Sequence, residues 1–354
     1  MATATIDEAK VEALVGAIVS DAGGAITALL VYLGDKLGFY KALADGNPVT
    51  AQQLATKTKT HPRLVREWLS NQAAAGYVTY DGDAETFSLS PEQAFALADE
   101  SSPALLNGFF QVIAAAFQST DKEIEAFRTG RGLAWGDHHH ELFDGTRRFF
   151  KAGYTGNLVS SWIPALDGVE EKLQAGAKVA DVGCGLGAST IILAQAYRRS
   201  TFVGFDYHGP SIDAARKAAA EAGVADRVTF EVASSYDFPG SAYDFIAFFD
   251  CWHDMGDPIK AATHAREALA PGGSIMLVEP FANDALKDNL NLVGKVFYGA
   301  STVICTPCSL DEGGLALGAQ AGPARTTSLL NEAGLSHTRV ATQTPFNIVY
   351  EARA

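Results

Sequence analysis

The second half of the sequence predicts an α/β fold, in which helices cover a mainly parallel sheet. Short apolar runs recur at 178–182, 201–206, 227–232 and 243–250. Alanine-rich stretches with helical spacing separate them, as successive βαβ units require. The run at 243–250 is almost entirely apolar, which is typical of a parallel strand buried on both faces.

The first predicted strand ends in a glycine-rich turn, D-V-G-C-G-L-G at 181–187. Glycine permits positive φ and lets a ligand approach the backbone closely. The helix that follows directs free N–H groups into the turn. The G-x-G-x-G spacing differs from the G-x-G-x-x-G of dinucleotide binders. Asp181 would repel a pyrophosphate and attract a cation, so the turn favours a ligand with positive charge.

The remaining strands place further polar groups at the same edge of the sheet. Asp206 ends the second strand roughly 20 residues beyond the turn, where a ribose-binding carboxylate is expected. Polar residues also follow the third and fourth strands. The turn L-A-P-G-G at 269–273 precedes a fifth strand at 274–278. Residues 335–341 and 346–352 predict a final antiparallel pair.

The turn resembles motif I of class I S-adenosylmethionine (SAM)-dependent methyltransferases, and the L-x-P-G-G turn is similar to theirs. The resemblance implies a seven-stranded Rossmann-like methyltransferase sheet with SAM as cofactor. Asp181 would hold the methionine end together with three glycines, and Asp206 would bind the ribose. The full set of expected cofactor contacts is Asp181, Gly183, Cys184, Gly185, Gly187, Asp206, Tyr207, Ser234, Ser235, Tyr236 and Asp250.

Residues 1–98 predict a winged-helix domain. A long helical stretch at 6–44 precedes Thr50, a candidate N-cap for the next helix. A second helix and two short strands joined by D-G-D follow. DNA binding would need a positive face, whereas the candidate recognition helix is nearly neutral and the wing tip is acidic. Dimerisation and covering of a substrate pocket are the expected roles, as in many small-molecule O-methyltransferases.

Two further domains are expected: a helical linker or cap at 99–170 and the SAM-binding domain at 171–354. Across nearly the whole chain, segments such as G-T-R-R-F-F-K-A-G-Y and W-I-P-A-L-D-G-V resemble a bacterial winged-helix methyltransferase family common in mycobacteria. The resemblance implies a small-molecule methyltransferase that is often dimeric.

The segment after the fourth strand carries the candidate catalytic residues. His253 and Asp254 match the H-D-W-x-D segment of small-molecule O-methyltransferases, whose histidine is the general base, while Met255 replaces the tryptophan. A base of near-neutral pKa contributes ~10²–10⁴-fold to proton transfer. The alternative is that His253 only hydrogen-bonds a structural turn. A thiol acceptor would need a strong base less, because its own pKa is lower.

Several other residues are weaker candidates. Trp135, His138, Tyr154 and Tyr298 are expected near the acceptor. Three consecutive histidines at 138–140 cannot all face one site, so no metal is predicted. The spacing Cys305-x-x-Cys308 has no second pair to complete a zinc site, and small buried residues near the pocket are expected there. For Arg147 and Arg148, surface or bridging ion pairs are expected.

Composition limits the remaining function classes. The net charge of −14 argues against nucleic acid and anionic membranes as partners. No signal peptide and no bilayer-spanning segment are expected. Four scattered cysteines indicate a reducing, cytoplasmic location. A SAM-sensing winged-helix regulator and an NAD-dependent oxidoreductase remain as alternatives to the enzyme.

Overall fold

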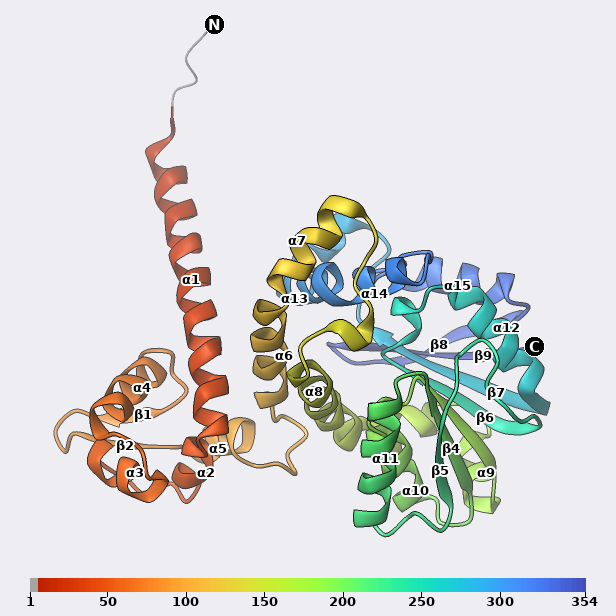
Figure 1. The fold of residues 1–354 in the computed structure, drawn as a ribbon, viewed down its shortest axis with the longest axis horizontal. Helices are drawn as coiled ribbons and strands as arrows, with labels where there is room; N and C mark the ends of the chain where they lie inside the picture. The colour runs from red at the N-terminus through yellow and green to blue at the C-terminus, as the bar shows by residue number, and fades with distance from the viewer. Residues whose placement is uncertain (1–5) are drawn as a thin grey trace, which may run out of the picture. The chain divides into compact units, whose positions relative to one another are not determined.

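The structure, a computed structural model, describes residues 6–354 and forms two compact units, 1–114 and 115–354 (Figure 1). Helix α6 (Asn107–Gln118) contains the boundary. Residues 115–170 belong to the same unit as the large sheet. The finer division at 98 and 170 stays a prediction.

The first unit has the predicted order of helix, turn, helix and hairpin. Thr50 caps its helix in a capping box with Gln53, because each side chain bonds the other residue's backbone N–H. Trp68 donates from Nε1 to the Leu30 carbonyl at 2.8 Å and packs on Phe39 and Tyr40. The elements are α1 (Glu8–Lys36), α2 (Phe39–Leu43), α3 (Ala51–Thr58), α4 (Pro62–Ala74), β1 (Thr79–Asp81), β2 (Thr86–Ser88) and α5 (Pro91–Leu97).

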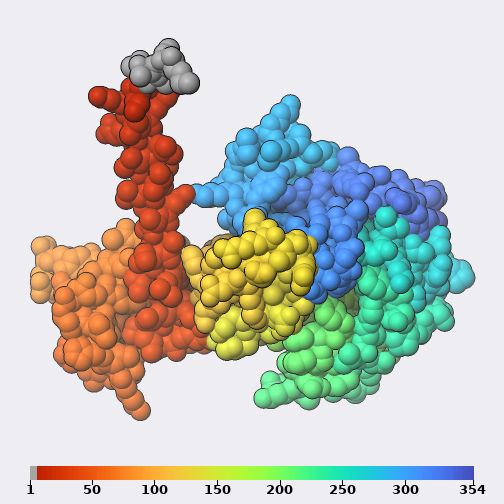
Figure 2. All heavy atoms as spheres, turned by 45° about the horizontal axis from the view of Figure 1, so that its top comes forward, coloured from red at the N-terminus to blue at the C-terminus, as the bar shows by residue number. Residues whose placement is uncertain are grey.

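Helix α1 corrects one expectation from the sequence. Its 29 residues are long and apolar enough to cross a membrane by length and composition, and only 11% of its most apolar window is buried. The expectation of no such segment was wrong because the apolar stretch continues through two glycines, Gly23 and Gly24, instead of ending there. Figure 2 shows the first half of α1, in red, standing clear of the rest of its own unit, in orange.

The second unit contains the predicted seven-stranded sheet, in the order β5-β4-β3-β6-β7-β9-β8. The first five strands in that order are parallel, and β9 and β8 complete the sheet as an antiparallel pair. The strands are β3 (Lys178–Val182), β4 (Thr201–Asp206), β5 (Val228–Val232), β6 (Tyr243–Phe249), β7 (Leu269–Pro280), β8 (His337–Gln343) and β9 (Asn347–Arg353).

Two apolar layers cover the sheet, because alternate residues of each strand point to opposite faces. Phe245 and Ala247 of β6 face one layer, whereas Ile246 and Phe248 face the other. The first layer includes α8 (Glu141–Asn157), α9 (Val169–Ala175), α10 (Ala188–Ala196) and α11 (Gly209–Glu221). The second includes α12 (Pro258–Ala268) and α15 (Gly322–Glu332).

Further short helices complete the second unit. The segment between β7 and α15 folds into helices, and its α14 contacts η4. The elements are α7 (Thr120–Thr129), η1 (Trp135–Asp137), η2 (Leu158–Trp162), η3 (Ile163–Ala165), η4 (Trp252–Asp254), η5 (Leu286–Asn289), α13 (Leu292–Ala300), η6 (Ser301–Cys305) and α14 (Thr306–Asp311).

Candidate active site

A cavity of about 990 Å³ opens beyond the carboxyl ends of β3, β4 and β6, entirely within the second unit. Gly183, Asp206 and Asp250 directly follow or end these strands, and all three lie on its wall. Ligands of open α/β sheets bind in this position, and the volume suits a cofactor together with a small second molecule.

The glycine turn supplies one wall of the cavity, and its backbone explains why glycine is needed. Gly183 has φ of 75° and Gly187 has φ of 78°. A Cβ at Gly183 would lie 2.6 Å from Cys251 Sγ, and one at Gly187 would lie 2.6 Å from Phe230 Cζ. Gly183, Cys184 and Gly185 line the cavity, whereas Gly187 caps α10 outside it.

Asp181 lies beneath the turn and not on the cavity wall. It is fully buried, and its Oδ2 accepts hydrogen bonds from Ser189 and Thr190, each at 2.6 Å. Burial raises its pKa to about 6. The expected direct contact with the cationic ligand is therefore corrected. Asp181 positions the first turn of α10, whose Ser189 does line the cavity.

Asp206 joins the turn to the next strand. Its carboxylate accepts from the backbone N–H of Gly185 at 2.9 Å and of His208 at 2.8 Å, and it lines the cavity. Burial raises its pKa. Each oxygen keeps a second lone pair, so the carboxylate can still accept from a pair of ribose hydroxyls. The neighbouring Tyr207 also lines the cavity.

Three of the expected cofactor contacts lie on the cavity wall just after β5: Ser234, Ser235 and Tyr236. The Tyr236 hydroxyl donates to Glu312 at 2.7 Å and accepts from the Asp257 N–H at 2.8 Å. Glu312 also accepts from the Gly256 N–H at 2.9 Å. All members of this cluster line the cavity, as does Met255.

Asp250 lies at the end of β6 with a left-handed backbone, φ 51°. Its carboxylate accepts from Tyr154 Oη at 3.0 Å and from Asn347 Nδ2 at 2.8 Å. Burial, with Glu279 nearby, raises the pKa of Asp250 to about 8. Both Asp250 and Tyr154 line the cavity, as does Trp135.

His253, the expected general base, does not line the cavity. It is buried, with Nδ1 2.7 Å from Glu279 Oε2 and Nε2 3.3 Å from Cys305 Sγ. Burial alone would lower its pKa, but Glu279 and Cys305 together raise that pKa well above the usual value. Because both ring nitrogens already have partners inside the protein and the ring does not reach the cavity, this geometry does not support the expected role of His253 as base.

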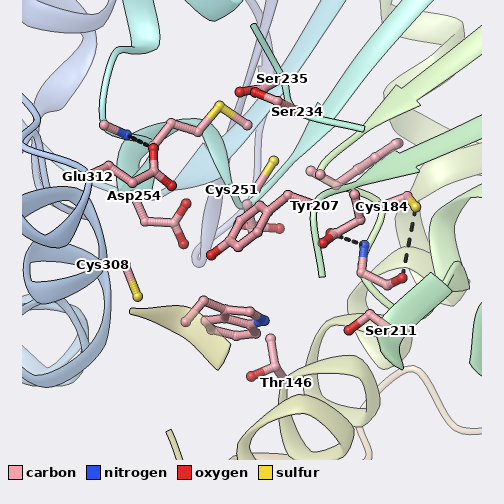
Figure 3. Close-up of a pocket in the computed structure, with 18 of the residues that line it drawn as sticks. Thr146, Cys184, Tyr207, Ser211, Ser234, Ser235, Cys251, Asp254, Cys308 and Glu312 are labelled. Atoms are coloured by element: carbon pink, nitrogen blue, oxygen red, sulfur yellow. Dashed lines mark hydrogen bonds between the residues drawn. The ribbon is translucent and has the colours of Figure 1, made fainter. Parts of the chain in front are cut away.

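Asp254, the next residue, does line the cavity. Burial raises the pKa of its carboxyl to about 7. In Figure 3 the Tyr207 ring crosses the cavity with its hydroxyl toward Asp254, and Cys308 lies beside them.

The weaker candidates fall in different places. His138 is buried behind the wall, with Nε2 3.9 Å from Cys308 Sγ, and burial lowers its pKa to about 4. Tyr298 also lies off the wall, whereas Cys308 lies on it and Cys305 behind it. Within residues 6–354 no group of three or more His, Cys, Asp or Glu side chains is arranged to hold a metal ion.

Sequence reasoning missed part of the cavity wall. In α8, residues at spacings of three and four line it, and this helical periodicity could have found them: Phe143, Thr146 and Phe150. Arg147, a weaker candidate from the sequence, lines the cavity as well. No sequence pattern indicated Glu312 or Lys260, because they approach the site only through tertiary folding. Arg147 is paired with Asp144 at 2.6 Å, in line with the expected ion pair.

The charge of the cavity suits a cation. Five carboxylates line it, and the basic residues on the wall are Arg147, already paired, and Lys260, which lies over the Tyr236 ring. The carboxylates are Asp206, Asp250, Asp254, Asp257 and Glu312. SAM supplies a sulfonium, an ammonium and ribose hydroxyls, so the turn, Asp206 and this charge together fit it.

Comparisons with known proteins agree with this geometry. Residues 173–334 match a methyltransferase domain family, and residues 25–99 match the Rv2258c-like winged HTH domain. Human N-acetylserotonin methyltransferase, solved in complex with SAM, has the same fold, with a TM-score of 0.71 at 14% identity over 100% of this chain and 99% of that one.

Two curated relatives are similar over part of their length. A probable chloroplastic tocopherol O-methyltransferase from Oryza sativa subsp. japonica is 26% identical over 46% of this chain and 48% of that protein. The 27-O-demethylrifamycin SV methyltransferase of Amycolatopsis mediterranei is 27% identical over 54% of this chain and 68% of that protein. With its fold, glycine turn and both matching domains, the chain belongs to the class I SAM-dependent methyltransferases, with a winged HTH domain at its N-terminal side.

Proposed function

We propose that the protein transfers the methyl group of SAM to an oxygen or sulfur nucleophile of a small molecule. The observation that carries this proposal is that a single cavity joins the glycine turn and Asp206 to a wall of aromatic side chains. The volume of about 990 Å³ leaves room for an acceptor beside SAM. When bound, SAM supplies an electrophilic methyl group on its sulfonium.

Residues on different parts of the cavity wall have different roles in the proposed reaction. Gly183 and Gly185 let the methionine end approach the backbone, and Asp206 accepts from the ribose hydroxyls. Trp135, Phe143 and Phe150 shield the acceptor from water. Packing against these rings also holds the acceptor in line with the carbon–sulfur bond of SAM. Proximity and orientation of this kind supply a large part of the rate enhancement.

Two alternatives from the sequence are disfavoured. A SAM-sensing regulator that binds DNA needs a positive surface, but Arg63 is paired with Glu67 and the wing carries Asp81 and Asp83. An NAD-dependent enzyme needs room for a pyrophosphate at the turn, but the G-x-G-x-G spacing differs from the dinucleotide pattern and Asp181 supplies negative charge beneath the turn. We also propose a cytoplasmic location, since all four cysteines are free thiols.

Calorimetric titration with SAM and with S-adenosylhomocysteine tests the proposal. We expect micromolar binding of both to the unaltered protein and a loss of at least tenfold in Asp206→Ala, because charge-assisted hydrogen bonds contribute about 1.5–3 kcal/mol. Asp213→Ala is the matched control, since Asp213 lies on α11 outside the cavity and is exposed. Failure of the unaltered protein to bind either compound would contradict the proposal.

A further inference from the structure

We propose that Asp254, and not His253, takes the proton from the acceptor, and that the acceptor is a molecule without negative charge that reacts through an acidic O–H or S–H. This inference rests on the proposed methyl transfer and names the base and the acceptor chemistry of the same cavity. His253 is then a positioning residue that sets the charge on Asp254.

Geometry separates the two neighbours. The 3₁₀ turn η4 directs the Asp254 carboxylate into the cavity and turns His253 away from it. Both nitrogens of His253 are engaged, by Glu279 at 2.7 Å and Cys305 at 3.3 Å. Neither oxygen of Asp254 has a hydrogen-bond partner within the described part of the chain. A base must reach the proton that it removes, and only Asp254 of this pair faces the cavity.

The groups around Asp254 bring the pKa of its carboxyl close to neutral pH. Burial raises its pKa, and the His253 imidazolium opposes that rise, leaving a value of about 7. A carboxylate with such a pKa can hold a proton transiently at physiological pH. The titratable groups that face it are His253, Glu279, Glu312, Asp206, Tyr207, Cys251 and Cys308.

The proposed step balances as a displacement with proton transfer. The acceptor oxygen or sulfur forms a bond to the methyl carbon of SAM while the bond between that carbon and the SAM sulfur breaks. The electron pair of the broken bond stays on the SAM sulfur. The acceptor proton moves to an Asp254 oxygen and afterwards to solvent. The sulfonium becomes a neutral thioether, so no redox partner is needed.

The same wall selects against anionic acceptors. A carboxylate on the acceptor would meet Asp254, Asp257 and Glu312 on the wall, while Arg147 is already paired with Asp144. An aliphatic alcohol is too weak an acid for a carboxylate to deprotonate. A phenol, with pKa about 10 as in tyrosine, or a thiol, with pKa about 8.5 as in cysteine, remains within reach.

Four probes with the same ring test this assignment: phenol, thiophenol, benzyl alcohol and benzoic acid. Transfer of a radiolabelled methyl group from SAM is measured across pH for the unaltered protein and for Asp254→Asn, Asp254→Glu and His253→Gln. The control is Asp237→Asn, which removes an exposed carboxylate outside the cavity. Melting temperature and SAM binding establish that each variant is folded.

We expect methylation of phenol and thiophenol only. Asp254→Asn should lower kcat on phenol by ~10²–10⁴-fold, with partial recovery in Asp254→Glu. On thiophenol at pH 9 the loss should be below tenfold, because that thiol ionises without a base and its one negative charge lies on the reacting sulfur, which faces the sulfonium of SAM and not the carboxylates of the wall. His253→Gln should move the acid limb of the phenol profile to higher pH, since losing the imidazolium raises the pKa of Asp254.

Three results would overturn the inference. The first is His253→Gln abolishing phenol methylation at every pH while Asp254→Asn remains active, which would make His253 the base. The second is methylation of benzoic acid or benzyl alcohol in preference to phenol. The third is no product from any probe while SAM binds normally, which leaves the cofactor site standing. Absence of SAM binding would instead contradict the proposed function itself.

Discussion

At the residue scale, carboxylates that look equivalent in the sequence have different positions and roles in the structure. Asp206 and Asp254 face the cavity, Asp250 faces it with both oxygens bonded, and Asp181 is sealed beneath the turn. The strand ends predicted their grouping, because carboxyl ends of parallel strands share one edge. Which oxygen faces a ligand depends on side-chain rotamers and on partners such as Asn347, which is far away in sequence.

The first prediction concerns the pH dependence of SAM binding. The pKa values of Asp250 and Asp254, about 8 and about 7, are raised, so both carboxyls are largely neutral at pH 6. A cation favours their ionised form. We therefore expect SAM affinity to rise between pH 6 and 7.5, by up to about tenfold per pH unit for each proton released.

S-Adenosylhomocysteine lacks the sulfonium, so its affinity should rise less over the same range. Calorimetry in a pH series, repeated in buffers of different ionisation enthalpy, measures both the affinity and the protons released. Equal slopes for the two compounds, or affinity falling with pH, would show that the sulfonium does not interact with these carboxylates.

The second prediction concerns Asp181 and the stability of the turn. In Asp181→Ala the hydroxyls of Ser189 and Thr190 would lose their acceptor inside the core, at a cost of about 1–3 kcal/mol for each unsatisfied group. Asp181→Asn keeps one acceptor oxygen and should cost less. Thermal unfolding of the two variants gives the order, and an equal loss in both would mean that the negative charge itself matters.

At the element scale, the strands and the glycine turn were predicted closely, whereas the internal fold of the insertion between β7 and α15 was not. The strands follow from apolar patterning, which is local. Glu312 reaches the cavity because Leu315 N–H bonds the Gly256 carbonyl at 2.9 Å and Ser309 Oγ bonds the Met255 carbonyl at 2.9 Å. No local pattern encodes such contacts between segments more than fifty residues apart. His253 was misplaced for the same reason, because Cys305 comes from that insertion.

The third prediction tests the turn through Gly183. Alanine there would force a Cβ to within 2.6 Å of Cys251 Sγ on a backbone with φ of 75°. The strain and the overpacking cost about 1–3 kcal/mol each, so Gly183→Ala should melt earlier and bind SAM at least tenfold more weakly.

Gly209→Ala is the matched control for this variant. A Cβ at Gly209 would have no neighbour within 4 Å, and this residue begins α11 at the same edge of the sheet. We expect its melting temperature and SAM affinity to stay close to those of the unaltered protein. Similar losses in both variants would mean that this edge of the sheet is sensitive to any added methyl group, so that the φ of Gly183 is not the cause.

At the scale of the whole molecule, the two parts of the fold were predictable from pattern, but the character of α1 was not. The helix has two faces. Thr27, Ala28, Val31 and Gly34 are buried within the first unit. Apolar side chains at spacings of three and four form an exposed stripe on another face: Val11, Leu14, Val15, Ile18, Val19, Ile26, Leu29 and Leu33. An exposed stripe of this kind marks an interaction surface.

The last prediction assigns this stripe to a second copy of the chain. Pairing two such stripes removes the apolar area of both from water, at about 25 cal/mol per Å², and the regular spacing allows side chains to interlock along the helix. A bilayer would also cover the stripe, but Asp21 and Lys10 lie within α1, and charges inside a membrane are costly.

Ile18→Asp places a charge in the middle of the stripe, where Ile18 is 57% exposed. We expect light scattering to show a dimer for the unaltered protein and a monomer for Ile18→Asp. Leu64→Asp, at a leucine of α4 that is 71% exposed, should stay dimeric. A monomeric unaltered protein that floats with lipid vesicles would assign the stripe to a membrane instead, and a dimer that survives Ile18→Asp would place the interface elsewhere.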